Sequence, residues 1–122
     1  MTNTAQALYG FFSGFGLDAY VQSSIPDNAR MPYITYELVE PEPLSYAVLH
    51  ASVWYRDTSY EDICAKCDEI KAAIGFGMSI PTGNGSIVLY RDKGSPFSQA
   101  MSDPNPETKR MVLTMLIFCN TD

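Results

Sequence analysis

Three cysteines and a single histidine are the side chains of this sequence best suited to redox or metal chemistry. Cys64 and Cys67 form a C-x-x-C pair, which in redox proteins opens a helix, where the helix N-terminus stabilises a thiolate. The surrounding pattern instead predicts that the pair lies inside a helix, with Cys67 on its apolar stripe. A zinc site needs four ligands, and only Cys119 and His50 are left to complete one. We therefore favour thiols that pack in the core. A thiol-dependent enzyme or metal-binding module that uses these four residues is the alternative.

No catalytic or phosphate-binding motif accompanies these residues. His50 is flanked by Leu49 and Ala51 in a predicted strand, and the sequence has no G-x-S-x-G element that would supply a nucleophile. It also lacks G-x-x-x-x-G-K-[ST] and G-x-G-x-x-G loops, and residues 102–107 lack the spacing of a calcium loop. We therefore expect that the chain is not an enzyme and has no catalytic residues, no cofactor and no metal site.

Composition predicts one globular domain over residues 1–122. Hydrophobic residues make up 46% and charged residues 18% of the chain, which is an ordinary balance for a folded protein. The net charge is −6 and the eight Lys and Arg residues are scattered, which argues against a grip on a nucleic-acid backbone. No apolar run is long enough to cross a membrane. The odd cysteine count, with no export signal at the N-terminus, favours reduced thiols inside a cell.

Two helices must position these residues. The first has an apolar stripe that starts at Leu8 and recurs at helical spacing, and Gly16 is typical of a helix end. The second carries a T-x-x-E capping box formed by Thr58 and Glu61 and runs to about Ile74. Both helices are amphipathic, so each is expected to dock on a sheet.

Strand patterns complete the predicted fold. Alternating side chains indicate four strands, at residues 33–40, 46–56, 86–92 and 107–119, with a brief extended piece at 18–21. Residues 79–85 and 93–106 are rich in turn residues and are expected to be connections. The expected fold class is α+β, with an antiparallel sheet of about four strands flanked by two main helices on one face.

The face of this sheet away from the helices is more apolar than a solvated face should be. Its large side chains are Tyr33, Val39, Tyr46, Val48, Trp54, Val112, Leu116 and Phe118. Such a surplus indicates a protein–protein interface, and the candidate subunit-contact residues are Tyr33, Thr35, Val39, Tyr46 and Trp54. The alternative is that helices cover both faces of the sheet.

One stretch carries a family resemblance. A proline-terminated loop runs directly into an aromatic strand in "IPDNARMPYITYEL", and a long strand ending in "VWYRD", a capped helix and two strands split by a loop follow. This order of elements resembles the tail terminator proteins of long-tailed bacteriophages, also called tail completion or head–tail joining proteins. The likeness in element order spans nearly the whole chain, whereas the specific motif is short.

The resemblance implies a structural role in a virion. Members of that family form a ring of six subunits on the last ring of the tail tube, at its head-proximal end. The ring stops tube polymerisation and joins the tail to the head connector, and DNA passes through its lumen without specific binding. The implied partners are further copies of this chain, the major tail tube protein and a head-closure or connector protein, after assembly in the host cytoplasm.

Two loops occupy the places where members of that family touch the tube or the connector. They span residues 40–45 and 93–107. The expected contact residues within them are Glu42, Leu44, Phe97 and Met101. The alternative within the same class is another head–tail connector component, such as a head-closure protein or a minor capsid or tail protein.

Overall fold

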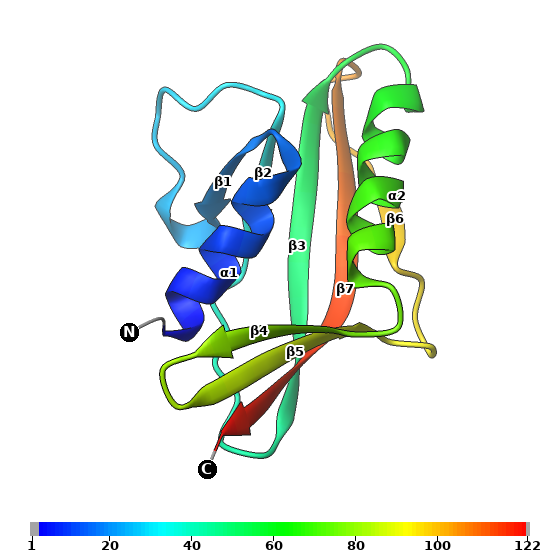
Figure 1. The fold of residues 1–122 in the computed structure, drawn as a ribbon. Coiled ribbons are helices and arrows are strands. Elements are labelled where there is room, and N and C mark those ends of the chain that lie inside the picture. The colour runs from blue at the N-terminus through cyan, green and yellow to red at the C-terminus, as the bar shows by residue number, and fades with distance from the viewer. Residues whose placement is uncertain (1–2, 122) are drawn as a thin grey trace.

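The computed structural model describes residues 3–121 as a curled sheet that carries two α-helices (Figure 1). The helices are α1 (Thr4–Phe12) and α2 (Glu61–Ile74), with short 3-10 turns η1 (Ser13–Phe15) and η2 (Gln22–Ser24). The strands are β1 (Asp18–Val21), β2 (Tyr33–Tyr36), β3 (Tyr46–Arg56), β4 (Met78–Thr82), β5 (Gly85–Arg91), β6 (Ser98–Met101) and β7 (Thr108–Thr121). No helix among the described residues is long and apolar enough to cross a membrane.

The sheet differs from the one expected from the sequence. It has seven strands in the order β1-β2-β3-β7-β5-β4, with β6 paired to β7 beside the main path. It is also mixed, because β1 pairs with β2 in parallel while the other pairs are antiparallel. The prediction of an α+β fold with an antiparallel sheet of about four strands is therefore wrong. The chain is mainly β, and its sheet forms a half-barrel.

The long strands β3 and β7 form the centre of this half-barrel. They pair along their length from Tyr46 opposite Phe118 to Arg56 opposite Thr108. On its other edge, β7 pairs with two strands. Its C-terminal part pairs with β5, and its N-terminal part pairs with β6. Figure 1 shows β4 and β5 crossing below both helices at a steep angle to β3, which gives the sheet its curl.

Three strand boundaries were misjudged from the sequence, for identifiable reasons. β2 ends at Tyr36 rather than near residue 40. The Glu37 amide still donates to the His50 carbonyl at 3.0 Å, but the His50 amide donates to the Glu37 carboxylate rather than to a backbone carbonyl. β4 contains Pro81 and precedes a glycine-rich turn, so it was expected to be a link; as an edge strand it tolerates the proline. β6 is largely exposed and lacks the apolar alternation that marks a strand.

The two helices are capped in different ways. Asn3 caps α1 by accepting from the Gln6 amide at 2.8 Å, and the Gln6 side chain accepts from the Asn3 amide in return. Gly16 ends η1 with a φ of +80°, which favours glycine. The Thr58 capping box of α2 is not formed: the N-cap position is Tyr60, and the Ser59 hydroxyl accepts from the Glu61 amide at 3.0 Å.

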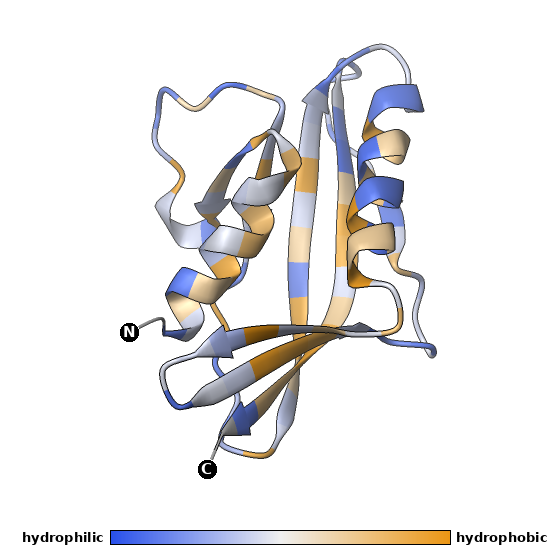
Figure 2. Cartoon of the chain, viewed as in Figure 1, coloured by the Kyte–Doolittle hydropathy of each residue, from blue (hydrophilic) through white to orange (hydrophobic). Residues whose placement is uncertain are grey.

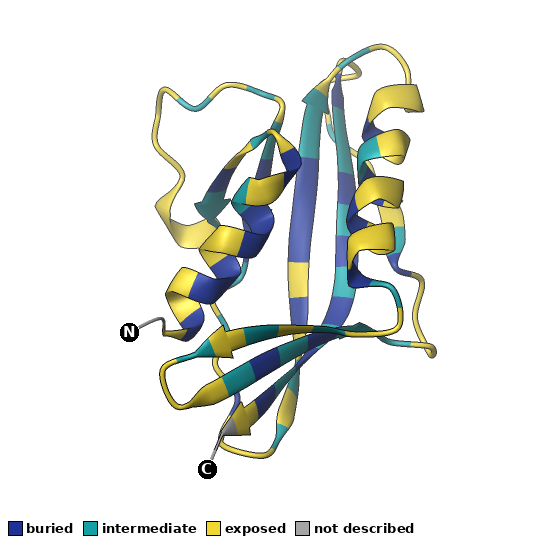
Figure 3. Cartoon of the chain, in the orientation of Figure 1, coloured by how far each residue is buried: buried dark blue, intermediate teal, exposed yellow. Residues whose placement is uncertain are grey.

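Both helices pack on the same face of the sheet, and the core lies between the layers. Figure 2 shows the apolar side of α1 and α2 turned toward the strands, and Figure 3 shows the same residues buried. Tyr36 is 2% exposed and its ring stacks on Phe12 at 4.7 Å. The alternate residues of β3 from Leu49 to Val53 and of β7 from Met111 to Ile117 complete this core. Among the described elements, no helix covers the opposite face.

Candidate interaction surface

The thiols and the histidine do not form a common site. Cys67 is buried under α2 and Cys119 is buried on β7, whereas Cys64 is exposed. His50 alternates with the core residues of β3 and therefore lies on the other face of the sheet. Within residues 3–121, no group of three or more His, Cys, Asp or Glu side chains is placed to hold a metal ion. Burial raises the pKa of the Cys67 thiol to about 12, with Cys64 and Asp68 adding to the effect, so this thiol is a poor nucleophile at neutral pH.

The sheet face opposite the helices, which we call the open face, is not covered by a helix in the described chain. Its residues follow from the strand register, because directly paired residues lie on the same side of a sheet. Tyr33 pairs with Trp54, and Trp54 with Arg110. At the other end Tyr46 pairs with Phe118, and Phe118 with Val88. The open face thus runs across β2, β3, β7 and β5.

A polar and aromatic cluster fixes one end of the open face. The Trp54 indole donates to the Thr35 hydroxyl at 3.0 Å, and the Arg110 guanidinium lies 4.6 Å from the Trp54 ring centre. Arg110 also donates through Nε to the Ser52 hydroxyl at 3.2 Å. Tyr33 packs against Trp54 with 6.3 Å between ring centres. These contacts hold Tyr33 and Trp54 in place while leaving both partly accessible; Thr35 is buried beneath them.

An apolar patch forms the other end of the open face. Tyr46 is 65% exposed and Val48 is 44% exposed, and both lie on the part of β3 that pairs with β7 but is not reached by β2. The strand register places four partly buried apolar side chains beside them: Val88, Tyr90, Leu116 and Phe118. A contiguous apolar patch on a sheet surface is typical of a protein contact.

An ionisable pair lies between these two ends. His50 Nδ1 and Glu37 Oε1 are 3.2 Å apart, and both side chains are about half exposed. The same carboxylate oxygen accepts from the His50 amide at 3.0 Å. Glu37 is thereby fixed at the edge of the open face, and the pair gives this face a polar centre.

The remaining predicted contact residues are spread over the molecule. Val39 lies just beyond β2, where the alternation has broken, and packs against the core, while its neighbour Leu38 is 52% exposed. Glu42 and Leu44 are exposed at the tip of the loop before β3, and Met101 is exposed on β6. Phe97 is buried at the start of the β6 segment. Met101 pairs with Arg110 and therefore lies on the open face, whereas Glu42, Leu44 and Phe97 are not on a strand of that face. The role of these residues as contacts stays a prediction.

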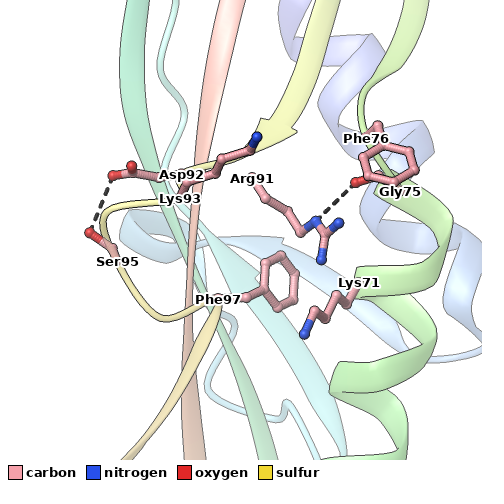
Figure 4. Close-up of a pocket in the computed structure, with 8 residues that line it drawn as sticks. All are labelled: Lys71, Gly75, Phe76, Arg91, Asp92, Lys93, Ser95 and Phe97. Atoms are coloured by element: carbon pink, nitrogen blue, oxygen red, sulfur yellow. Dashed lines mark hydrogen bonds between the residues drawn. The ribbon is translucent and has the colours of Figure 1, made fainter.

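A pocket of about 280 Å³ lies beside the C-terminal end of α2, and sequence reasoning missed it (Figure 4). Three cationic side chains line it, Lys71, Arg91 and Lys93, together with Phe97 and the exposed ring of Phe76. Figure 4 shows Arg91 reaching toward Gly75, whose carbonyl accepts from Arg91 Nε at 2.9 Å. The lysines are 22 positions apart in the sequence, so only the fold reveals the cluster. We call this site the basic pocket.

Comparison with known proteins adds one finding about the fold. No protein-family model matches the sequence, and no curated protein matches it. One solved structure with a similar chain is described as "Virion of native gene transfer agent (GTA) particle". The two chains share 16% sequence identity and superpose with a TM-score of 0.66 over 92% of this chain and 90% of that chain. At this identity the likeness shows a common fold.

Proposed function

We propose that this chain is a structural protein of a phage-like virion, and within the virion a tail terminator. In this role six copies form a ring on the head-proximal end of the tail tube. The ring stops tube polymerisation and joins the tail to the head connector, while DNA passes through its lumen. The proposal gives the chain no catalytic function, cofactor or metal.

The observation that carries the proposal is the likeness to a chain of a gene transfer agent virion, which extends over nine tenths of both chains. A shared fold does not by itself fix a function, so the surface of this chain has to support the same role. The open face does so, because Tyr46 and Val48 are large exposed apolar side chains on a rigid sheet. Such a surface suits a stable contact in an assembly better than it suits water.

The assignment to the terminator within the virion rests on sequence and charge. The segment from Ile25 to Leu38 and the order of strands around α2 supply the resemblance to tail terminators. The net charge of −6 suits a ring whose lumen must not hold DNA, because like charges repel. The segments at 40–45 and 93–107, the second of which contains β6, supply further contacts to another copy, the tube or the connector.

Deletion of the gene tests the assignment. Electron microscopy of lysates should show overlong tail tubes and separate, filled heads, because nothing stops the tubes or joins them to heads. Tails of normal length beside leaking heads would instead assign the chain to head closure. Normal, infectious particles would contradict a structural role altogether. Expression of the wild-type chain from a plasmid should restore tail length and particle yield.

A further inference from the structure

The basic pocket has unused capacity to bind an acidic group. Among the described residues, the Lys71 and Lys93 ammonium groups have no hydrogen-bond or ion-pair partner. Arg91 donates one hydrogen bond, from Nε to the Gly75 carbonyl. The one carboxylate in the lining, Asp92, is occupied by the Gly94 amide and the Ser95 hydroxyl. Three cations and one engaged carboxylate leave a local excess of positive charge on a chain that is acidic overall.

Phe76 marks the mouth of the same pocket as a contact surface. Its side chain is 96% exposed, although it stands in a short turn between α2 and β4 rather than in a long loop. Its only ring contact among the described residues is with Arg91, at 5.9 Å from the ring centre. An aromatic ring and an arginine side by side are the residue types that dominate binding energy at protein interfaces.

The loop before β3 has the complementary composition. Residues 40–45 read E-P-E-P-L-S, and we call them the acidic loop. Its tip carries the exposed Glu42 carboxylate and the Leu44 side chain, which is 65% exposed. Leu44 has a φ of +57°, which is uncommon for a residue with a β-carbon and is often kept for function.

The acidic loop is also held in one shape. The Leu44 amide donates to the Cys119 carbonyl at 2.7 Å, and the Cys119 amide donates to the Ser45 carbonyl at 2.9 Å. The Ser45 hydroxyl donates to the Glu42 carbonyl at 2.7 Å. A loop that is already ordered loses little conformational entropy when it binds.

From these features we infer that the acidic loop of one copy binds in the basic pocket of the next copy. Glu42 pairs with Lys71 or Lys93, and Leu44 packs on the exposed Phe76 ring. This inference rests on the proposed self-assembly. It makes a second copy of the chain, rather than the tube or the connector, the partner of Glu42 and Leu44. Copies with a net charge of −6 repel one another in general, so they associate best where a basic site meets an acidic segment.

The proposed contact joins two different places on the chain, as a head-to-tail contact requires. The acidic loop lies near the C-terminal end of β7, whereas the basic pocket lies at the ends of α2 and β5 (Figure 1). Each copy therefore offers one loop and one pocket at different places. A heterologous contact of this kind continues from copy to copy and forms a ring when the rotation closes.

Two complementary variants test the inference. The pocket variant carries Lys71→Glu and Lys93→Glu, and the loop variant carries Glu42→Lys and Leu44→Gly. Glycine adopts the backbone conformation of Leu44 without strain, so the loop variant should fold. We expect each variant alone to self-associate at least about tenfold more weakly than the wild type in low salt, as measured by sedimentation.

A mixture of the two variants separates this contact from other modes of association. Each variant alone brings like charges together at the contact, whereas in the mixture every loop–pocket contact again joins opposite charges, so the mixture should associate more strongly than either variant alone. Carbodiimide coupling of wild-type copies, one set labelled with ¹⁵N, should join Glu42 of one copy to Lys71 or Lys93 of another. The control variant carries Arg30→Glu and Arg56→Glu. These substitutions change the net charge by the same amount as those of the pocket variant, and the control variant should associate like the wild type.

Each alternative outcome overturns the inference, and the outcomes separate it from the proposed function. Wild-type association in the pocket variant, or couplings only between other residues, rejects the loop–pocket contact. If those variants still cap tail tubes, the terminator role stands without it. A wild-type chain that stays monomeric at every concentration and caps no tubes rejects both.

Discussion

Tyr33 and Tyr36 leave the same four-residue strand in opposite directions and have different tasks. Tyr36 is buried and stacks on Phe12, which joins α1 to the sheet. Replacement of Tyr36 by alanine should lower the free energy of unfolding by about 3–5 kcal/mol, because it empties a large site in the core. Urea denaturation of the purified variant measures this loss.

Tyr33 is the matched comparison on the open face. It is half-buried, and its ring meets that of Tyr20 in a T-shaped contact and that of Trp54 at a tilt. Its replacement by alanine should cost about 1 kcal/mol of folding stability, while it weakens association of the assembled form by about tenfold. Equal losses of folding stability in the two variants would contradict the division of roles between these tyrosines.

Cys67 makes stability depend on pH in alkaline solution. The thiol has an ordinary pKa of 9.0, and burial raises the pKa in the folded chain to about 12. Between these values the unfolded chain has lost the proton and the folded chain has kept it. The free energy of unfolding should therefore be unaffected by this group below about pH 9 and fall as the pH rises toward 12.

Burial also raises the pKa of Tyr36 and Tyr55, so the contribution of Cys67 has to be isolated by substitution. Cys67→Ala should show a shallower fall in unfolding free energy above pH 9 than the wild type, whatever its stability at pH 7. Cys64→Ala removes an exposed thiol and should keep nearly the wild-type slope. If the unfolding free energy of the wild type and of Cys67→Ala fell equally steeply above pH 9, the pKa of this thiol would not be raised in the folded chain.

At the scale of elements, the capping of α1 is a local interaction that sequence could foresee. Asn3 and Gln6 satisfy each other's amides at the start of the helix. Asn3→Ala should destabilise the protein by about 1 kcal/mol, whereas Asn3→Ser keeps a capping oxygen and should cost much less. Thermal unfolding followed by circular dichroism compares the two. A loss as large for serine as for alanine would argue that the cap has another role.

The strands show where sequence patterns stop being informative. β3 was predicted at its observed bounds, because small and apolar residues recur at every second position from Ala47 to Tyr55. β4 and β6 were missed, because Pro81 and the exposed residues of β6 give no alternation. β4 forms a tight hairpin with the next strand, β5, whose turn residues led to the whole segment being interpreted as a link, whereas β6 pairs with β7 across a longer connection. The missed strands changed the architecture from a small open sheet to a half-barrel.

Some residues of the candidate surfaces could be predicted from the sequence, and others could not. Tyr46 and Trp54 were identified from the sequence, because large side chains on the face opposite a core strand are visible as alternation. The basic pocket was not, since Lys71, Arg91 and Phe97 come from three separate elements. Phe76 could have been noticed as an aromatic residue between two glycines, but its near-complete exposure required the fold.

At the scale of the whole molecule, the chain has an acidic balance and two kinds of candidate contact surface. The open face carries an apolar patch at one end, while the basic pocket and the acidic loop are charged and complementary. Contacts of the second kind weaken as salt screens charge, whereas apolar contacts do not. An assembly built from both should resist moderate salt and lose its head-to-tail contacts first.

The terminator role is tested most directly by the polymerisation of tail tubes in the presence of this chain. Purified tube protein from the same virus is polymerised with increasing amounts of the wild-type chain, and tube lengths and labelled ends are measured by electron microscopy. The account predicts shorter tubes with the chain as a single ring at one end only. Tubes of unchanged length with no chain at either end would contradict it.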